Sequence, residues 1–223
     1  MFNTDMVQAI LDGRKTVTRR VIRYKYSNTE MKMRTDKYGA RLIEIQKDIE
    51  GETHGRNPDG STWHKLLPYI EKNPPYRKKD ILYVRETWST HYTGDSNGEL
   101  VFCYKADGIN LKSECLPGER NRWYPSIHMP KEAARIWLKV IDMRIERLQD
   151  ITEKQAEAEG AIDNRGFIHS YANEYDVIHS GREHFEKIWD STIRKSDRTL
   201  YGWGANPWVW VVNFERCERP EVV

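Results

Sequence analysis

The octapeptide Gly13–Arg20 combines reactive and anion-binding side chains more densely than any other stretch of this length in the chain. Thr16 and Thr18 carry hydroxyl groups, which become nucleophiles when a base removes their proton. Between Gly13 and Thr29 the basic residues Arg14, Lys15, Arg19, Arg20, Arg23 and Lys25 occur without an acidic residue. Such a run favours phosphate binding. The alternative is a solvated edge strand whose cations prevent aggregation.

Local patterns place this octapeptide at the junction of a helix and a strand. Val7, Ile10 and Leu11 have the spacing of a helical stripe within Thr4–Leu11, and Asn3 or Thr4 is available as the N-cap. Asp12-Gly13 provides a stop signal. Thr16-Val17-Thr18 is β-branched throughout, which favours a strand. We therefore expect side chains and backbone N–H groups to converge on a ligand at this turn.

Residues Ile10–Thr18 followed by Arg20 resemble the opening motif L-x-G-x-K-T-x-T-x-R of the ASCH (ASC-1 homology) domain family. A second stretch, Ile151–Glu159, is similar to the short helix after the middle strand of that family's barrel. Leu82–Trp88 and Asn206–Trp210 resemble the longer ASCH proteins of phages and prophages. The resemblance implies an α+β fold with a PUA-like β-barrel, flanking short helices and, here, a large insertion after the first strand at residues 24–79.

The resemblance also implies a chemistry and its residues. Some small bacterial ASCH proteins are amidohydrolases that remove the acyl group from N4-acetylcytidine with a lysine, a threonine and a glutamate, which correspond to Lys15, Thr18 and Glu159. A lysine serves as a base when burial or neighbouring cations lower its pKa. Glu159 would then handle the proton of the leaving amine or attacking water.

This arrangement requires that Lys15 belong to the turn, because in an uninterrupted strand Lys15 and Thr18 would point to opposite faces. Thr16 is the alternative nucleophile. The chain is also about twice as long as the short amidohydrolases, so segments 24–79 and 165–206 have no counterpart in them. Arg14, Arg19 and Arg20 are expected to bind substrate, and Arg19, where those enzymes have an apolar residue, favours a nucleotide or an RNA end.

Asp80–Trp88 is the clearest predicted strand, and its alternation places Glu86 and Trp88 on one face with Leu82 and Val84. Glu86 would be either a pocket residue that contacts substrate or one half of a structural ion pair with Arg19 or Arg20. Glu99–Lys105 is expected to form a hairpin with this strand across a turn at residues 94–98.

Trp123 and Tyr124 lie beside Arg120 and Arg122, a combination that suits base stacking with phosphate contacts. The alternative is a loop whose aromatic rings cover the end of the barrel. A non-enzymatic reader would bind RNA or a modified base with this loop and with the basic patch between Arg14 and Lys25.

Four further elements follow from pattern. Ile136–Leu148 alternates as a long barrel strand, and Trp208–Arg216 alternates with Trp208, Trp210, Val212 and Phe214 on one face. Thr152 with Gln155 forms a capping-box pair, and Gly160 is the stop of the helix that they begin. Residues 183–193 place Phe185, Ile188 and Trp189 on one helical stripe.

Composition limits the classes of protein to consider. The chain has 223 residues and a formal net charge of +2, so nucleic-acid affinity must come from local patches. Cys103, Cys115 and Cys217 are widely spaced, so we expect a reduced cytoplasmic protein without a metal or cofactor. No segment is apolar enough for a membrane span. We expect a single domain over residues 1–223 that is an amidohydrolase or ribonuclease, a reader of RNA, or a phage-linked interaction protein.

Overall fold

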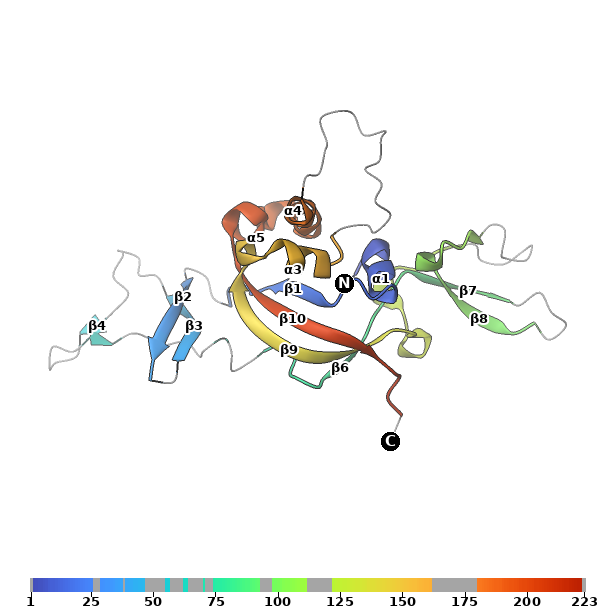
Figure 1. The fold of residues 1–223 in the computed structure, drawn as a ribbon, viewed down its shortest axis with the longest axis horizontal. Coiled ribbons are helices and arrows are strands. Elements are labelled where there is room, and N and C mark those ends of the chain that lie inside the picture. Colours follow the sequence, from blue (N-terminus) through green and yellow to red (C-terminus); the bar gives the residue numbers. More distant parts are fainter. Residues whose placement is uncertain are drawn as a thin grey trace, which may run out of the picture.

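The computed structural model describes residues 2–25, 29–37, 39–46, 55–56, 62–63, 70, 74–92, 98–111, 122–161 and 180–221 (Figure 1). Its strands are β1 Val17–Val21, β2 Thr29–Asp36, β3 Gly39–Gln46, β4 Gly55–Arg56, β5 Thr62–Trp63, β6 Ile81–Tyr83, β7 Trp88–Tyr92, β8 Leu100–Tyr104, β9 Trp137–Arg147 and β10 Trp208–Cys217. Its α-helices are α1 Thr4–Leu11, α3 Glu153–Ala158, α4 Gly181–Thr192 and α5 Arg198–Tyr201. Short 3-10 helices are η2 Lys105–Asp107, η3 Ser126–His128, η4 Lys131–Ala133, η5 Leu148–Asp150, η6 Lys195–Asp197 and η7 Trp203–Ala205.

The central feature is a curled antiparallel sheet with the strand order β1-β10-β9-β6. The long strands β9 and β10 bend together, and their register shifts between Asn213 and Phe214, as at a β-bulge. Figure 1 shows the two strands curving around the hollow side of the sheet. The fold is therefore α+β with a half-barrel, and in the described part of the chain β1 and β6 form its open edges.

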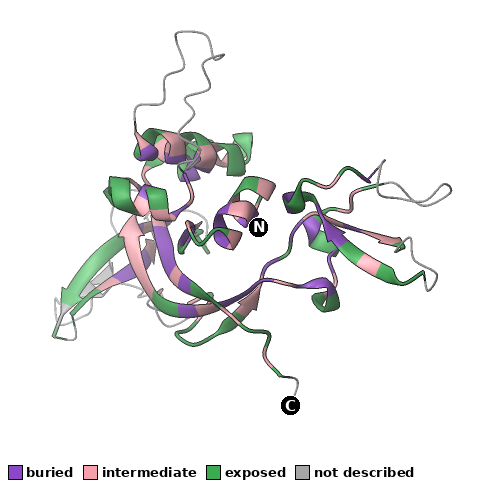
Figure 2. Ribbon diagram, turned by 45° about the vertical axis from the view of Figure 1, so that its right-hand side comes forward, coloured by how far each residue is buried: buried purple, intermediate pink, exposed green. Residues whose placement is uncertain are grey.

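The two faces of this sheet are both covered. Val209 and Val211 of β10 pack with Phe185 and Trp189 of α4 on one face. Trp210 and Val212 pack with Val140 and Leu42 on the other face, where Trp208 also lies. The predicted alternation along β10 is confirmed, and Figure 2 shows buried stretches on the curled strands, which in β10 comprise Val209–Val212 and Phe214.

The helix predictions are also confirmed. In α1 the Asn3 side chain accepts a hydrogen bond from the Met6 N–H (2.8 Å), and Asp12 is the C-cap residue. The capping box of Thr152 and Gln155 is formed at the start of α3, where each side chain accepts from the other residue's N–H. These caps satisfy backbone groups that would otherwise lack partners.

Segment 24–79 contains a hairpin, formed by β2 and β3. Met31 and Leu42 of this hairpin pack against Ile22 and Trp210, so its base belongs to the core. Figure 1 shows it at one end of the molecule and the β7–β8 hairpin at the opposite end.

The prediction of one strand over Asp80–Trp88 was wrong. Pairing with β9 ends where the Val84 N–H donates to the Ile136 carbonyl (3.0 Å), and β7 begins a separate sheet with β8 at Trp88. Between them, Glu86 accepts two hydrogen bonds from Arg135, which lies two residues before β9. The predicted hairpin with β8 is formed, with β7 as the partner.

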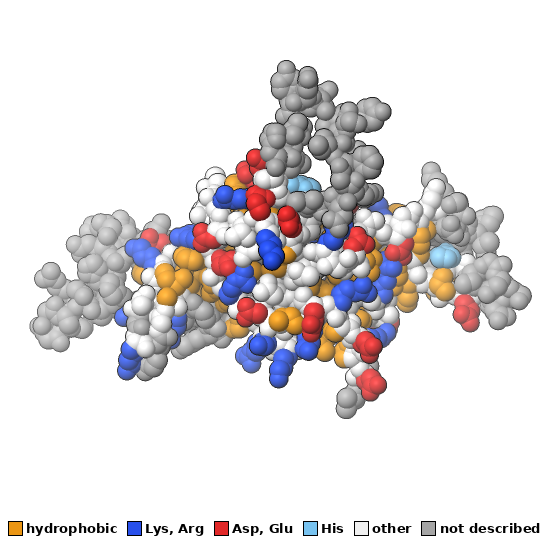
Figure 3. Space-filling view, viewed as in Figure 1, with side chains coloured by type: hydrophobic (Ala, Val, Ile, Leu, Met, Phe, Trp, Pro, Cys, Tyr) orange, Lys and Arg blue, Asp and Glu red, His pale blue; other side chains and the backbone are white. Residues whose placement is uncertain are grey.

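Charged residues are distributed over the surface. On the face seen in Figure 3, basic and acidic side chains are interspersed over the central body, in keeping with the net charge of +2. Any preference for an anionic ligand therefore comes from local positions.

Candidate functional site

The carboxylate of Glu159 and the ammonium of Lys15 form a buried ion pair at the junction of α1, β1 and α3. Lys15 Nζ lies 2.7 Å from Glu159 Oε2, and the two side chains are 0% and 4% exposed. Lys15 precedes the first residue of β1, as the catalytic arrangement required, and its N–H donates to the carbonyl of Ala9 (2.9 Å). Glu159 is the C-cap residue of α3.

Gly160 allows these two segments to approach each other. Its φ of +82° is accessible mainly to glycine, and a Cβ there would lie 2.9 Å from Ala9 Cβ and 3.5 Å from Lys15 Cβ. The stop glycine predicted after α3 therefore also makes room for Lys15.

Lys15 has three acceptors for its three N–H bonds. Nζ donates to Glu159 Oε2 (2.7 Å), to the Glu159 carbonyl (2.7 Å) and to the Val17 carbonyl (2.9 Å). Burial lowers the pKa of Lys15 from the ordinary lysine value, and Glu159 opposes this shift. Arg20 and Arg19 add smaller contributions that also lower it.

Arg19 supplies a second cation to the same carboxylate. Its guanidinium lies 3.3 Å from Glu159 Oε1 and 3.2 Å from Glu146 Oε2, and it donates to Gln155 Oε1 (3.0 Å). The Arg19 side chain is 0% exposed. The expected phosphate ligand is thus already replaced by protein carboxylates, and Arg19 holds Glu159 in place.

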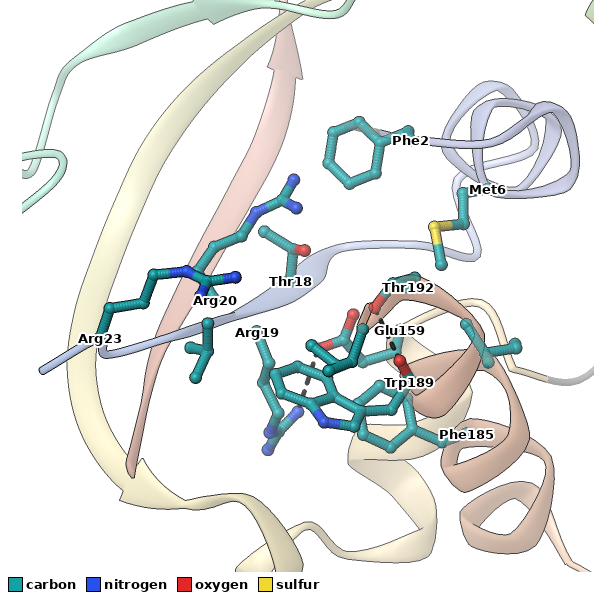
Figure 4. Close-up of a pocket in the computed structure, with 13 residues that line it drawn as sticks. Phe2, Met6, Thr18, Arg19, Arg20, Arg23, Glu159, Phe185, Trp189 and Thr192 are labelled. Carbon is teal, nitrogen blue, oxygen red and sulfur yellow. Dashed lines mark hydrogen bonds and ion pairs between the residues drawn. The ribbon is translucent and has the colours of Figure 1, made fainter. Parts of the chain in front are cut away.

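A pocket of about 360 Å³ opens beside β1, and we call it the β1 pocket (Figure 4). Its polar wall includes Thr18, Arg19, Arg20, Arg23 and Glu159, and its aromatic wall comprises Phe2, Phe185 and Trp189. Lys15 lies behind this wall and is absent from the lining. The wall joins a carboxylate, a hydroxyl and several cations with aromatic rings.

Thr18 and Arg20 face the β1 pocket from one side of the strand, whereas Arg19 and Glu159 lie on the other side (Figure 4). The Thr18 hydroxyl has no hydrogen-bond partner among the described residues, and Thr18 is 9% exposed. The Arg20 guanidinium lies 5.2 Å from the Phe2 ring centre and forms no ion pair within the described part of the chain. Both groups are available to a ligand.

The backbone of β1 contributes further donors. The Thr16 carbonyl accepts from the Phe214 N–H and the Ile22 N–H donates to Trp208 (both 2.9 Å). Because antiparallel pairing alternates, Arg19 and Val21 direct their backbone groups away from β10. Their N–H groups have no partner among the described residues, and both residues line the β1 pocket.

The remaining predicted site residues lie elsewhere. Arg14 forms an ion pair with Asp12 (3.0 Å) and does not line the β1 pocket. Trp88 stacks on Tyr124 with a centroid distance of 5.1 Å, and the two are joined by a β-bridge. Trp123 is half-buried beside this bridge and does not line the β1 pocket. The rings of Trp88 and Tyr124 therefore contact each other, and Arg120 lies outside the described residues.

Glu86 is half of a structural ion pair, but the predicted partner was wrong. Arg135 Nε and Nη2 donate to the two carboxylate oxygens of Glu86 at 2.9 and 2.8 Å, and Glu86 is 1% exposed. Arg135 also lies 2.8 Å from Asp107. Arg19 and Arg20 are on β1, whereas Arg135 lies two residues before β9, the strand with which β6 pairs.

Sequence reasoning missed several residues of this site. Phe2 supplies one aromatic wall, yet as a single aromatic residue near the start of the chain it gave no periodic signal. Phe185 and Trp189 were predicted as core residues, and they serve both the core and the pocket wall. Glu146 lies in the alternating pattern of β9. Only the pairing of β1, β10 and β9 shows that its side chain lies on the same side of the sheet as that of Arg19.

Among the described residues, no group of three or more His, Cys, Asp or Glu side chains has the arrangement of a metal site. Within the same residues, no helix combines the length and apolar character needed to cross a membrane. Comparisons with known protein families, with curated proteins and with solved structures found no match for this chain.

Proposed function

We propose that the β1 pocket binds a modified nucleobase and hydrolyses an amide on it, as the resemblance to the ASCH amidohydrolases implies, with N4-acetylcytidine as the reference substrate. The observation that carries this proposal is the buried Lys15–Glu159 pair, whose carboxylate reaches the wall of a pocket that Thr18 also lines. A pocket with aromatic walls and a few convergent polar groups suits a planar base.

Thr18 is the nucleophile in this proposal. Its hydroxyl oxygen attacks the amide carbonyl carbon. Because Thr18 and Glu159 lie on opposite sides of β1, the hydroxyl proton reaches Glu159 through a water molecule in the pocket that both residues line. The C–N bond then breaks, and the same proton is returned to the leaving amino group of the base. Water hydrolyses the resulting ester, so that the free acid and the Thr18 hydroxyl are restored. The outward N–H groups of Arg19 and Val21 are donors for the substrate's oxygen atoms.

The division of roles between Lys15 and Glu159 follows from their positions. Glu159 lines the β1 pocket and Lys15 does not, so Glu159 exchanges protons with the substrate. Lys15 and Arg19 hold that carboxylate from behind. Lys15 is therefore a positioning residue and a proton partner of Glu159, whereas the resemblance assigned it the role of base.

Purified protein incubated with N4-acetylcytidine tests the proposal, with cytidine and acetate measured by liquid chromatography. We expect Thr18→Ala to reduce turnover to the background rate and Glu159→Gln to reduce kcat by at least about a hundredfold. Thr16→Ala is the matched control, because Thr16 is exposed, lies outside the pocket lining and was the alternative nucleophile. Full turnover by Thr18→Ala, or no release of cytidine by the wild type, would contradict the proposal.

A further inference from the structure

A second pocket of about 340 Å³ lies on the face of the curled sheet that carries Val212, and we call it the hollow pocket. Leu82, Leu138 and Val212 contribute to its apolar lining. Phe2, Thr18 and Arg20 line both this pocket and the β1 pocket, so the two are neighbours. A ligand that fills the β1 pocket beside Thr18 can extend past Arg20 into the hollow pocket.

The lining of the hollow pocket contains two arginines and no acidic residue. Arg20 forms no ion pair within the described part of the chain. Within the described residues, Arg85 donates to neutral oxygens alone, namely the Tyr83 hydroxyl (2.9 Å for Nη2) and the Ile127 carbonyl (3.3 Å). Neither positive charge is neutralised by a described carboxylate, whereas Arg19, Arg23 and Arg135 all have acidic partners. Two such guanidinium groups in one pocket favour an anion.

The ring-bearing residues narrow the chemistry of that anion. Tyr76, Tyr83 and Phe2 line the hollow pocket together with the two arginines. The Arg85 guanidinium lies 5.4 Å from the Tyr83 ring centre, which fixes its direction. Aromatic rings beside a cationic pair are what a nucleotide requires, because its base or sugar packs on the rings and its phosphate contacts the arginines.

We infer that the hollow pocket is a phosphate subsite in which Arg20 and Arg85 bind the phosphate of a nucleotide whose base occupies the β1 pocket. This inference rests on the proposed function and specifies its substrate as a nucleotide or an oligonucleotide, in preference to a free nucleoside. Arg20 lies between the two sites, and Arg85 is a specificity residue contributed by the segment after β6.

The test compares binding of cytidine, cytidine 5′-monophosphate, cytidine 3′-monophosphate and the dinucleotide cytidylyl-cytidine by isothermal titration calorimetry. We expect the preferred phosphorylated ligand to bind about tenfold or more tightly than cytidine, and Arg20→Gln or Arg85→Gln to remove most of that difference. Tighter binding of a monophosphate indicates that the subsite takes the 5′- or 3′-phosphate of a single nucleotide. Tighter binding of the dinucleotide alone indicates that it takes the phosphate that joins two nucleotides.

Lys139→Gln is the charge-matched control, because it removes an exposed cation of β9 that lines neither pocket. Circular dichroism checks that each variant is folded. Equal affinity for cytidine and all phosphorylated ligands, or an equal loss with Lys139→Gln, overturns the subsite. If nucleotides bind through Arg20 and Arg85 while no amide is cleaved, the subsite stands and the hydrolase proposal fails. If hydrolysis depends on Thr18 but phosphorylated ligands bind no more tightly than cytidine, the hydrolase proposal stands and the subsite fails.

Discussion

At the scale of single residues, the site depends on how four charged groups pair. Lys15 and Arg19 both contact Glu159, Arg19 also contacts Glu146, and Arg20 contacts none of them. Neighbours in sequence therefore have different functions, because successive residues of a strand point to opposite faces. The sequence alone showed a uniform basic run, and this division required the position of β1 against α3.

Lys15→Met is expected to lower the free energy of unfolding by about 3 kcal/mol near neutral pH, because it leaves a buried carboxylate with fewer partners. The effect depends on pH. Between the lowered pKa of Lys15 and the ordinary lysine value, the unfolded chain holds a proton that the folded chain has released, so wild-type stability gains from rising pH there. Urea unfolding of both proteins should show that the difference between their free energies of unfolding increases as the pH rises through this range. A difference that decreases would contradict the lowered pKa of Lys15.

Arg19 and Arg20 form a second pair of variants. Arg19→Gln should lower the free energy of unfolding by about 3 kcal/mol, because Glu159 and Glu146 lose a buried cation. Arg20→Gln should change it by less than about 0.5 kcal/mol, since Arg20 has no described ion pair to lose. Urea denaturation measures both free energies of unfolding. Equal effects of the two substitutions would contradict a structural role for Arg19 that Arg20 lacks.

At the scale of elements, local signals predicted α1, α3, α4 and the long strands correctly. Caps and stripes of apolar residues determine these elements within a few residues of sequence. The division of Asp80–Trp88 into β6 and β7 could not be predicted, because β6 pairs with β9 and β7 pairs with β8, and the local pattern does not show this change of partner. Likewise, Lys15 and Glu159 are 144 positions apart in the sequence, so only the family resemblance indicated that they contact each other.

Gly160 tests how the end of α3 positions Glu159. Gly160→Ala should destabilise the protein by about 1–3 kcal/mol and reduce turnover, because the new Cβ meets Ala9 and the positive φ is strained. Gly204→Ala is a suitable control, since nothing lies within 4 Å of its added Cβ and no positive φ is required. Thermal unfolding and the cytidine release assay measure the two effects; equal behaviour of the two variants would contradict this role for Gly160.

At the scale of the whole molecule, the hairpin of segment 24–79 is part of the core. Leu42 is 0% exposed and packs with Met31 and Trp210, so Leu42→Ala should cost about 2–5 kcal/mol. Met33, its cross-strand partner in β2, is 43% exposed, and Met33→Ala should cost much less. Chemical denaturation distinguishes the two, and a negligible cost at Leu42 would mean that the hairpin folds apart from the half-barrel.

The open edge of β1 determines how an inhibitor bound there would respond to amino-acid substitutions. The donors at positions 19 and 21 belong to the main chain, so a compound anchored on them does not depend on which side chains these positions carry. Natural variants that replace Arg19 or Val21 would keep that anchor as long as the strand persists. Proline is the only one of the twenty residues that lacks a backbone N–H group. Only a substitution to proline at position 19 or 21 would therefore remove one of these two donors.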